Sequence, residues 1–309
     1  MIEAVHLTKK YGPHTAVEDL TFTIREGQVY GFLGPNGAGK TTTMNMITGY
    51  LAPTAGEVRI DGTDLRTDPV PARRRIGYLP EVPPLYPDLT VREYLLFAAE
   101  LKGVPGRRRR EEADKVMKEL SLMEMKDRLI RALSKGYRQR TGIAQALLGD
   151  PKTVILDEPT AGLDPRQITE IRSLIRRLGK DHAVLLSSHI LQEISETCDT
   201  VLILSEGKKA AEGSPETLAG EQSKTTVTVL TAGEEAVIRA ALAGIAGAPE
   251  LRISAEGGRK RLVITKNGNE DPGAGITAAL VGNGLPVYEI TSDRRSLEEL
   301  FLSLTKEGR

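Results

Sequence analysis

The sequence predicts an α/β fold, in which parallel strands alternate with helices, followed by a small α+β domain. A glycine-rich segment at 34–41 stands between an apolar strand and the start of a helix. Two continuous apolar runs, at 153–156 and 183–186, are typical of parallel strands that are covered on both faces. Helical spacing over 165–178 joins them into a strand–helix–strand unit. Beyond residue 220 the order becomes strand, helix, strand, strand, helix, strand, which is the ferredoxin-like arrangement.

The other elements of the first part of the chain follow from local patterns. Alternating apolar residues bounded by turn residues predict short strands, and apolar residues three or four apart predict helices. Strands are expected at 2–7, 17–24, 28–33 and 57–62, and helices at 90–101 and 111–122. We expect these elements to surround the parallel strands in one domain, residues 1–220.

A second, smaller domain is expected at residues 225–309, after a polar linker at 221–224. Its βαββαβ order is followed by a last helix, for which Ser296 and Glu299 form a capping pair. The strands are expected at 225–230, 250–255, 261–266 and 286–291, and the helices at 234–247 and 273–281.

Composition excludes several classes of protein. The 309 residues carry 42 basic and 42 acidic side chains, so no bulk charge favours binding to nucleic acid. The one cysteine, Cys198, rules out an internal disulfide framework and indicates a reducing compartment. The first residues lack a signal-peptide layout, and no stretch approaches 18 apolar residues. We therefore expect any role at a membrane to depend on a partner.

The segment 34–41, Gly-Pro-Asn-Gly-Ala-Gly-Lys-Thr, fits the pattern G-x-x-x-x-G-K-[ST] without a mismatch. In such a loop, glycines allow the backbone amides to approach phosphate oxygens at a helix N-terminus. Lys40 would neutralise the β and γ phosphates, and the hydroxyl of Thr41 would bind Mg²⁺. An accidental glycine-rich turn is disfavoured by the flanking strand and helix. The residues expected to hold the nucleotide here are Asn36, Gly37, Ala38, Gly39, Lys40, Thr41 and Thr42.

Two carboxylates, Asp157 and Glu158, directly follow the buried strand at 153–156. The ends of parallel strands beside a phosphate-binding loop are where α/β folds bind ligands. Asp157 is placed to orient Mg²⁺, and Glu158 to polarise the attacking water as a general base. An isolated acid at a strand end could instead cap the helix that follows. The intact phosphate loop in the same chain favours catalysis.

At this point the chain resembles the nucleotide-binding subunit of ATP-binding cassette (ABC) transporters, over residues 1–220. Further segments match that family's motifs in its order. Tyr11 corresponds to the aromatic residue that stacks on adenine, and His189 to the switch histidine. Ala-Gly-Leu-Asp at 161–164 resembles the D-loop. The resemblance implies a P-loop ABC cassette with an antiparallel β subdomain and a helical subdomain.

Residues 133–139, Leu-Ser-Lys-Gly-Tyr-Arg-Gln, resemble the family signature LSGGQ. Ser134 and Gly136 match it, whereas Lys135 and Tyr137 depart from it. Taken alone, the string predicts a helix N-terminus capped by Ser134. The resemblance implies that Ser134 and Gly136 bind the γ-phosphate held by a second subunit.

Glu81 occupies the position where the family has the glutamine of its Q-loop. That glutamine touches Mg²⁺ and the attacking water. A glutamate keeps an oxygen for the metal, adds a negative charge and removes the amide donor. Our hypothesis is that Glu81 serves as the Q-loop residue with a distinct metal role. The apolar, proline-rich segment 83–91 that follows corresponds to the surface that receives the coupling helix of the membrane subunit.

The resemblance thus implies an ATP hydrolase that binds ATP and Mg²⁺. Glu158, His189 and Lys40 would be catalytic, and Thr41, Glu81 and Asp157 would hold the metal. The subunit would act as a homodimer or a paralogous heterodimer, with an integral membrane permease of the ABC-2 type and without nucleic acid. It would lie on the cytoplasmic face of the cell membrane through that permease. The motifs around Glu81 and the closing segment 296–301 favour the branch of ABC-2 exporters, which includes gliding-motility-like and multidrug-efflux systems.

Three alternatives remain open at the level of sequence. One is an importer ATPase with a C-terminal regulatory domain. Another is a soluble ABC ATPase that acts on DNA or the ribosome, although no second cassette, long coiled-coil insertion or net basic charge is present. The third is a regulatory nucleotide sensor that does not hydrolyse ATP. The C-terminal domain itself could be a ligand sensor or a second dimer contact, and the cargo is not encoded in this chain.

Overall fold

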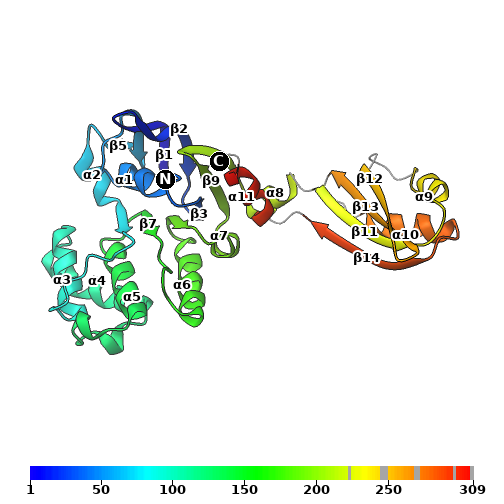
Figure 1. Cartoon of the computed structure of the whole chain (residues 1–309). Helices are drawn as coiled ribbons and strands as arrows, with labels where there is room; N and C mark the ends of the chain where they lie inside the picture. The colour runs from blue at the N-terminus through cyan, green and yellow to red at the C-terminus, as the bar shows by residue number, and fades with distance from the viewer. Residues whose placement is uncertain (222–223, 244–249, 268–271, 295–296, 307–309) are drawn as a thin grey trace. The chain divides into compact units, whose positions relative to one another are not determined.

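The computed structural model describes residues 1–221, 224–243, 250–267, 272–294 and 297–306. The chain divides into two compact units, of which the first is Met1–Ser214 and the second begins at Pro215 (Figure 1). The predicted linker and last helix fall partly outside the described residues, because 222–223 and 295–296 are not among them. In the described part of the chain, no helix has both the length and the apolar character needed to cross a membrane.

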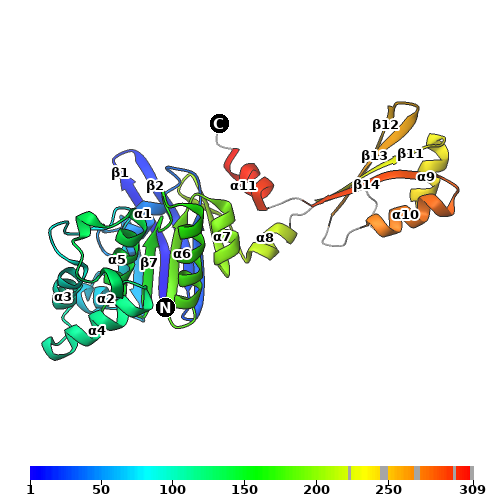
Figure 2. The same cartoon turned by 90° about the horizontal axis from the view of Figure 1, so that it is seen from below.

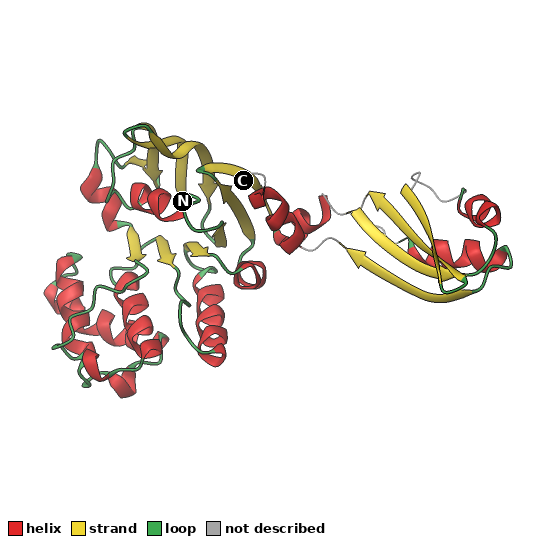
Figure 3. Ribbon diagram, viewed as in Figure 1, coloured by secondary structure: helices red, strands yellow, loops and turns green. Residues whose placement is uncertain are grey.

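The first unit contains two sheets, a group of helices beside them and helices around the larger sheet (Figure 3). The strands are β1 (Ile2–Tyr11), β2 (His14–Ile24), β3 (Gln28–Leu33), β4 (Ala55–Ile60), β5 (Thr63–Asp64), β6 (Ile76–Leu79), β7 (Thr153–Asp157), β8 (Ala183–Ser188), β9 (Thr200–Ser205) and β10 (Lys208–Gly213). The helices are α1 (Lys40–Ile47), α2 (Pro69–Arg74), α3 (Val91–Leu101), α4 (Gly106–Glu119), α5 (Lys135–Leu147), α6 (Pro165–Leu178) and α7 (Leu191–Thr197).

The larger sheet has the strand order β10-β9-β3-β8-β7-β6, in which all neighbours are parallel except the edge strand β10. Its register pairs Leu33 with Ser188 and Asp157 with Ser187. The carboxyl ends of β3, β7 and β8 therefore lie at the same edge of the sheet. The phosphate loop, the two carboxylates and the switch histidine follow these three strands, so the parallel sheet brings the predicted motifs together.

The smaller sheet is antiparallel, with the order β2-β1-β4-β5. Its apolar face packs against the larger sheet in one core, in which the ring of Phe22 contacts Tyr30 and Phe32. Helices α3, α4 and α5 pack on one another in a separate helical group (Figure 1). The predicted α/β fold with an antiparallel β subdomain and a helical subdomain is confirmed.

The second unit contains a four-stranded antiparallel sheet of order β12-β13-β11-β14, and α9 and α10 cover one face of it (Figure 2). Its core includes Val229 and Leu262 from the strands and Ile238 and Ile276 from the helices. This is the predicted ferredoxin-like arrangement. The elements are α8 (Pro215–Glu221), β11 (Lys224–Thr231), α9 (Glu235–Leu242), β12 (Glu250–Glu256), β13 (Arg259–Asn267), α10 (Gly273–Gly282), β14 (Val287–Arg294) and α11 (Leu297–Lys306).

Several boundaries differ from the sequence prediction. Helix α4 begins at Gly106 instead of residue 111, because the arginines at 107–110 extend the helix, all but the partly buried Arg109 with exposed side chains. Strand β6 and the edge strand β10 were not predicted, because β6 is only four residues long and β10 is largely polar, so both are specified by their neighbours in the sheet. The end of the helix expected at 234–247 falls on residues outside the described ones, and α9 is described over Glu235–Leu242.

Candidate ATP-binding and hydrolysis site

The phosphate loop leaves β3 at Leu33 and enters α1 at Lys40. Gly39 immediately precedes the helix in the left-handed region, with a φ of 99°. A Cβ at this position would lie 2.8 Å from the carbonyl oxygen of Ala16, so only glycine fits. The amides that follow therefore start a helix directly at the loop, which is the geometry of an anion cradle.

The side chain of Lys40 is held inside this loop. It is 8% exposed, and its ammonium group donates hydrogen bonds to the carbonyl oxygens of Gly34 at 2.6 Å and Pro35 at 3.2 Å. Burial lowers the pKa of Lys40, and the negative charges of Glu158 and Asp157 oppose that shift. The loop therefore holds a cation next to two carboxylates.

Ser187, at the end of β8, links the two carboxylates that follow β7. Its hydroxyl donates to Oδ1 of Asp157 at 2.5 Å and accepts the backbone N–H of Glu158 at 3.0 Å. Glu158 has a φ of 47°, a conformation that few non-glycine residues adopt. The hydrogen bond from its N–H to Ser187 therefore stabilises a strained backbone conformation.

His189 contacts the carboxylate of Glu158 with both oxygens within reach, at 3.0 and 3.1 Å from Nδ1. Because a carboxylate oxygen accepts, this contact assigns the hydrogen to Nδ1. The imidazole is 53% exposed and Glu158 only 13%. The pair thus joins the loops after β7 and β8 at the surface of a cleft.

That cleft has a volume of about 440 Å³ and brings together most of the residues predicted to bind or hydrolyse a nucleotide. Ala38 and Asp157 do not line it, since they are 2% and 3% exposed and lie beneath its surface. His14, Ala16 and Ala161 line it without having been predicted. The predicted residues that line it are Tyr11, Asn36, Gly37, Gly39, Lys40, Thr41, Thr42, Glu81, Glu158 and His189.

The carboxylates of Asp157, beneath the cleft, and Glu81, in its lining, place negative charge near Thr41. Burial raises the pKa of Asp157, the hydrogen bond from Ser187 lowers it, and Glu81 raises it further. Hydroxyl and carboxylate oxygens are the ligands that Mg²⁺ prefers. A cation near Thr41, Glu81 and Asp157 would offset the repulsion between the carboxylates, so these residues suit such an ion.

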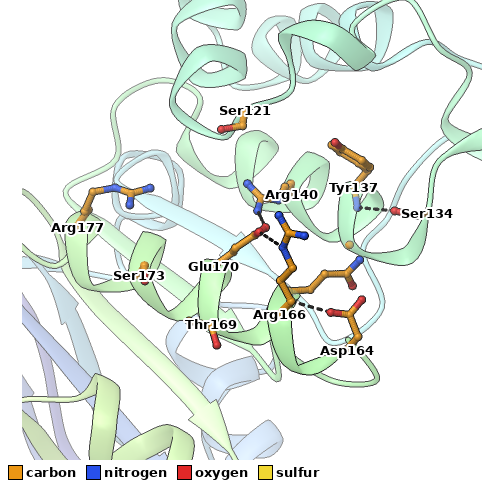
Figure 4. Close-up of a pocket in the computed structure, with 12 residues that line it drawn as sticks. Ser121, Ser134, Tyr137, Arg140, Asp164, Arg166, Thr169, Glu170, Ser173 and Arg177 are labelled. Carbon is orange, nitrogen blue, oxygen red and sulfur yellow. Dashed lines mark hydrogen bonds and ion pairs between the residues drawn. The ribbon is translucent and has the colours of Figure 1, made fainter.

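The segment that resembles the signature lies elsewhere in the unit. Ser134 is the N-cap of α5 and accepts the backbone N–H of Tyr137 at 3.4 Å. Ser134 and Gly136 line a second cavity of about 710 Å³ between α5 and α6, in which Glu170 lies between Arg140 and Arg166 (Figure 4). Neither residue lines the cleft of the phosphate loop. Within one chain, the phosphate loop and the segment that resembles the signature therefore line different cavities.

Sequence reasoning missed two buried residues that shape this site. Ser187 precedes the switch histidine by two positions, in the segment Ser-Ser-His at 187–189, of which only the histidine was predicted to act. Glu193, on α7, accepts hydrogen bonds from a hydroxyl in the loop after β7 and from a hydroxyl at the end of β8. A serine pair before the histidine was the available signal for the first. Nothing in the sequence singled out the second among many acidic residues.

A phosphate loop at the edge of a parallel sheet, with a buried aspartate and a glutamate beside it, is the arrangement of a P-loop protein that binds and hydrolyses nucleotides. The family model described as "ABC transporter" matches residues 17–161. The chain is also 36% identical to the bacitracin transport ATP-binding protein BcrA of Bacillus licheniformis, over all of this chain and 98% of that protein. The chain belongs to the ABC transporter family, as an ATP-hydrolysing subunit.

Other comparisons agree with that assignment. The Nod factor export ATP-binding protein I of Ralstonia nicotianae is 32% identical over 97% of this chain and 92% of its own length. Among solved structures, the ABC transporter cassette MJ0796 matches with a TM-score of 0.63 and 28% identity. The match covers 69% of this chain and 98% of that one. MJ0796 was solved as a dimer, and also as a post-hydrolysis dimer bound to ADP and phosphate.

Proposed function

We propose that two copies of this chain, or this chain and a paralogue, close head to tail around two MgATP. Each site would combine the phosphate loop, Glu158 and His189 of one copy with Ser134 and Gly136 of the other. The observation that carries the proposal is the separation of the two motifs within one chain, since they line different cavities. The dimeric state of the related cassette MJ0796 supports it.

Hydrolysis in this site would be in-line attack of water on the γ-phosphorus, with release of ADP and phosphate. Glu158 would accept the proton of that water, from the orientation that Ser187 stabilises. His189, with its hydrogen on Nδ1, would offer Nε2 to the γ-phosphate or the water. Lys40 would leave the carbonyl oxygens of Gly34 and Pro35 and pair with the phosphates.

Mg²⁺ would be held by Thr41, Asp157 and Glu81, together with phosphate oxygens and water. The ion would neutralise charge on the β and γ phosphates. Glu81 lines the cleft and also a neighbouring cavity, so its side chain can contact groups bound in either one. We propose that it is the Q-loop residue of this chain.

The direct test of the catalytic assignment is Glu158→Gln. The amide cannot accept the proton, so we expect turnover to fall by about 100-fold or more, with ATP binding retained. ATP should then hold the variant as a dimer, which size-exclusion chromatography with light scattering would detect. Glu26→Gln, at an exposed position paired with Lys152, is the control. A Glu158→Gln protein that stays monomeric with ATP and still hydrolyses it would contradict the proposal.

A mixing experiment tests whether the sites are shared. Lys40→Ala removes one half of each site, and Ser134→Arg blocks the other half with a bulky side chain. In a head-to-tail dimer of one chain of each kind, one site is intact and the other lacks both halves. Mixing the two inactive proteins should therefore restore up to about a quarter of the wild-type turnover. If every site were complete within one chain, the mixture would remain inactive.

The surface around 82–87 supports a membrane partner. Val82 is 79% exposed, and Tyr86 is 52% exposed with its ring against that of Phe97. The adjacent cavity of about 530 Å³ is lined by apolar residues of this segment and by the cations Arg131, Lys135 and Arg138. We propose that it receives the coupling helix of an ABC-2 type membrane subunit, which would hold the chain at the cytoplasmic face of the membrane.

The direction of transport is proposed as export, because the relatives named above include a Nod factor export protein. A cysteine at position 82 offers a test, since the natural thiol, Cys198, is buried. After co-expression with an ABC-2 type membrane protein from the same organism, Val82→Cys should cross-link to it. Cross-linking to a permease that works with a periplasmic receptor would instead favour an importer.

The second unit is proposed as an accessory domain of the same transporter subunit. The similarity to BcrA extends over the whole chain, so that relative has a corresponding region. A ligand-sensing role and a second dimer contact both remain compatible with a ferredoxin-like sheet that has helices on one face. Deleting the chain from Pro215 onward and measuring the dimer dissociation constant would separate them.

A further inference from the structure

A buried carboxylate lies behind the loops that carry Glu158 and His189. It belongs to Glu193, in the first turn of α7, which is 4% exposed and does not line the cleft. Its Oε2 accepts hydrogen bonds from Thr160 Oγ1 at 2.7 Å and from Ser188 Oγ at 2.9 Å. Its Oε1 is buried without a hydrogen-bond partner among the described residues.

The two donors belong to different segments of the proposed catalytic site: Thr160 lies in the loop after β7, and Ser188 is the last residue of β8. Thr160 follows Glu158 by two positions, in a turn where the N–H of Ala161 donates to the carbonyl oxygen of Glu158 at 3.1 Å. Ser188 directly precedes His189, and its hydroxyl also accepts the N–H of Ile190 at 3.0 Å. One carboxylate oxygen therefore ties the turn after Glu158 to the turn that contains His189.

Stability alone does not explain a carboxylate at this position. Taking a charge out of water is unfavourable, and an apolar side chain of similar volume is often neutral or stabilising in its place. The second oxygen adds a further penalty because it is desolvated without a donor. What the carboxylate supplies is an acceptor that two hydroxyls can share, so that the spacing between the two loops is held constant.

We propose that Glu193 is a positioning residue for ATP hydrolysis. It holds the loops after β7 and β8 in the relative position that brings His189 Nδ1 within 3.0 Å of Glu158. The inference rests on the proposed catalytic roles of Glu158 and His189. Because Glu193 lies outside the cleft, it acts through Thr160 and Ser188 and not on the nucleotide.

The experiment compares Glu193→Met with Glu193→Gln in steady-state ATPase assays. Methionine fills the space without accepting hydrogen bonds, so kcat should fall by about tenfold or more while KM for ATP changes less than about twofold. The glutamine carbonyl oxygen can still accept from both hydroxyls, so this variant should keep kcat within about threefold of wild type. Gln192→Met, at the neighbouring exposed position, is the control.

Two results would overturn the proposal. One is an unchanged kcat in a folded Glu193→Met protein, and the other is an equal loss in Glu193→Gln and Glu193→Met. If Glu193→Met does not fold, Thr160→Val removes one of the two donors, and it too must lower kcat with KM unchanged. Glu158→Gln and His189→Ala in the same assay test the proposed function separately, since retained turnover in those variants refutes the catalytic roles whatever Glu193 does.

Discussion

Replacing Ser187 by alanine removes the hydroxyl that joins Asp157 to the backbone of Glu158. The lost hydrogen bonds are a buried, charge-assisted one to Asp157 and a partly buried one from the backbone N–H of Glu158. A hydrogen bond to a charged group contributes about 2 kcal/mol and a neutral one about 1 kcal/mol, so we expect a loss of about 3 kcal/mol. For a unit of this size that corresponds to roughly 10 °C in melting temperature.

The same change should affect catalysis, because the strained backbone of Glu158 loses its hydrogen-bond acceptor. A displacement of the general base by about 1 Å lowers turnover on the order of 100-fold. ATP binding should be preserved, since the phosphate loop is untouched. Steady-state kinetics and thermal unfolding of the same preparation give both numbers. Thr67→Ala, which removes a hydroxyl at an exposed turn position outside both cavities, is the control. A Ser187→Ala protein that melts early but keeps kcat within twofold of wild type would refute the reasoning on catalysis.

Two further predictions concern charge. Lys102 donates to the carbonyl oxygens of Ala146 and Leu148 at the end of α5, and burial lowers its pKa from 10.5 to about 8. Between these values the unfolded chain binds more protons, so stability relative to Lys102→Met should rise with pH, by about 2 kcal/mol from pH 7.5 to 9.5 in urea unfolding. A pH-independent difference would contradict this. Glu81→Gln should raise the Mg²⁺ concentration for half-maximal turnover several-fold, because the variant has one carboxylate fewer near the metal. Glu57→Gln is the control. An unchanged Mg²⁺ titration in Glu81→Gln would contradict a distinct metal role.

Much of the fold could be predicted from the sequence, because strongly patterned segments carry their own signal. Helix α6 was predicted with its observed bounds, 165–178, from its helical spacing between two apolar strands. The continuous apolar runs became β7 and β8. Strand β6 was missed because Ile-Gly-Tyr-Leu becomes a strand only beside β7, with Gly77 against the backbone of Ala146.

The candidate site divides in the same way. Short motifs identify functional residues that lie close together in the sequence, such as the phosphate loop around Lys40 and the carboxylate pair at 157–158. They do not name residues whose role depends on a neighbour that is distant along the chain. Ser187 is 30 residues from Asp157, and Glu193 is 33 residues from Thr160.

By itself, the sequence determined that this chain binds and hydrolyses a nucleotide, because a glycine-rich loop with a lysine, and two acids at the end of a buried strand, leave few other chemistries. That the nucleotide is ATP followed from the resemblance to a known family. The tertiary structure decided which residues share one cleft and which lie apart from it. It placed Ser134 and Gly136 in a separate cavity and joined the loops of Glu158 and His189 through Ser187 and Glu193. The physical reason is that the register of the parallel strands sets these distances, and register arises only when the whole sheet forms.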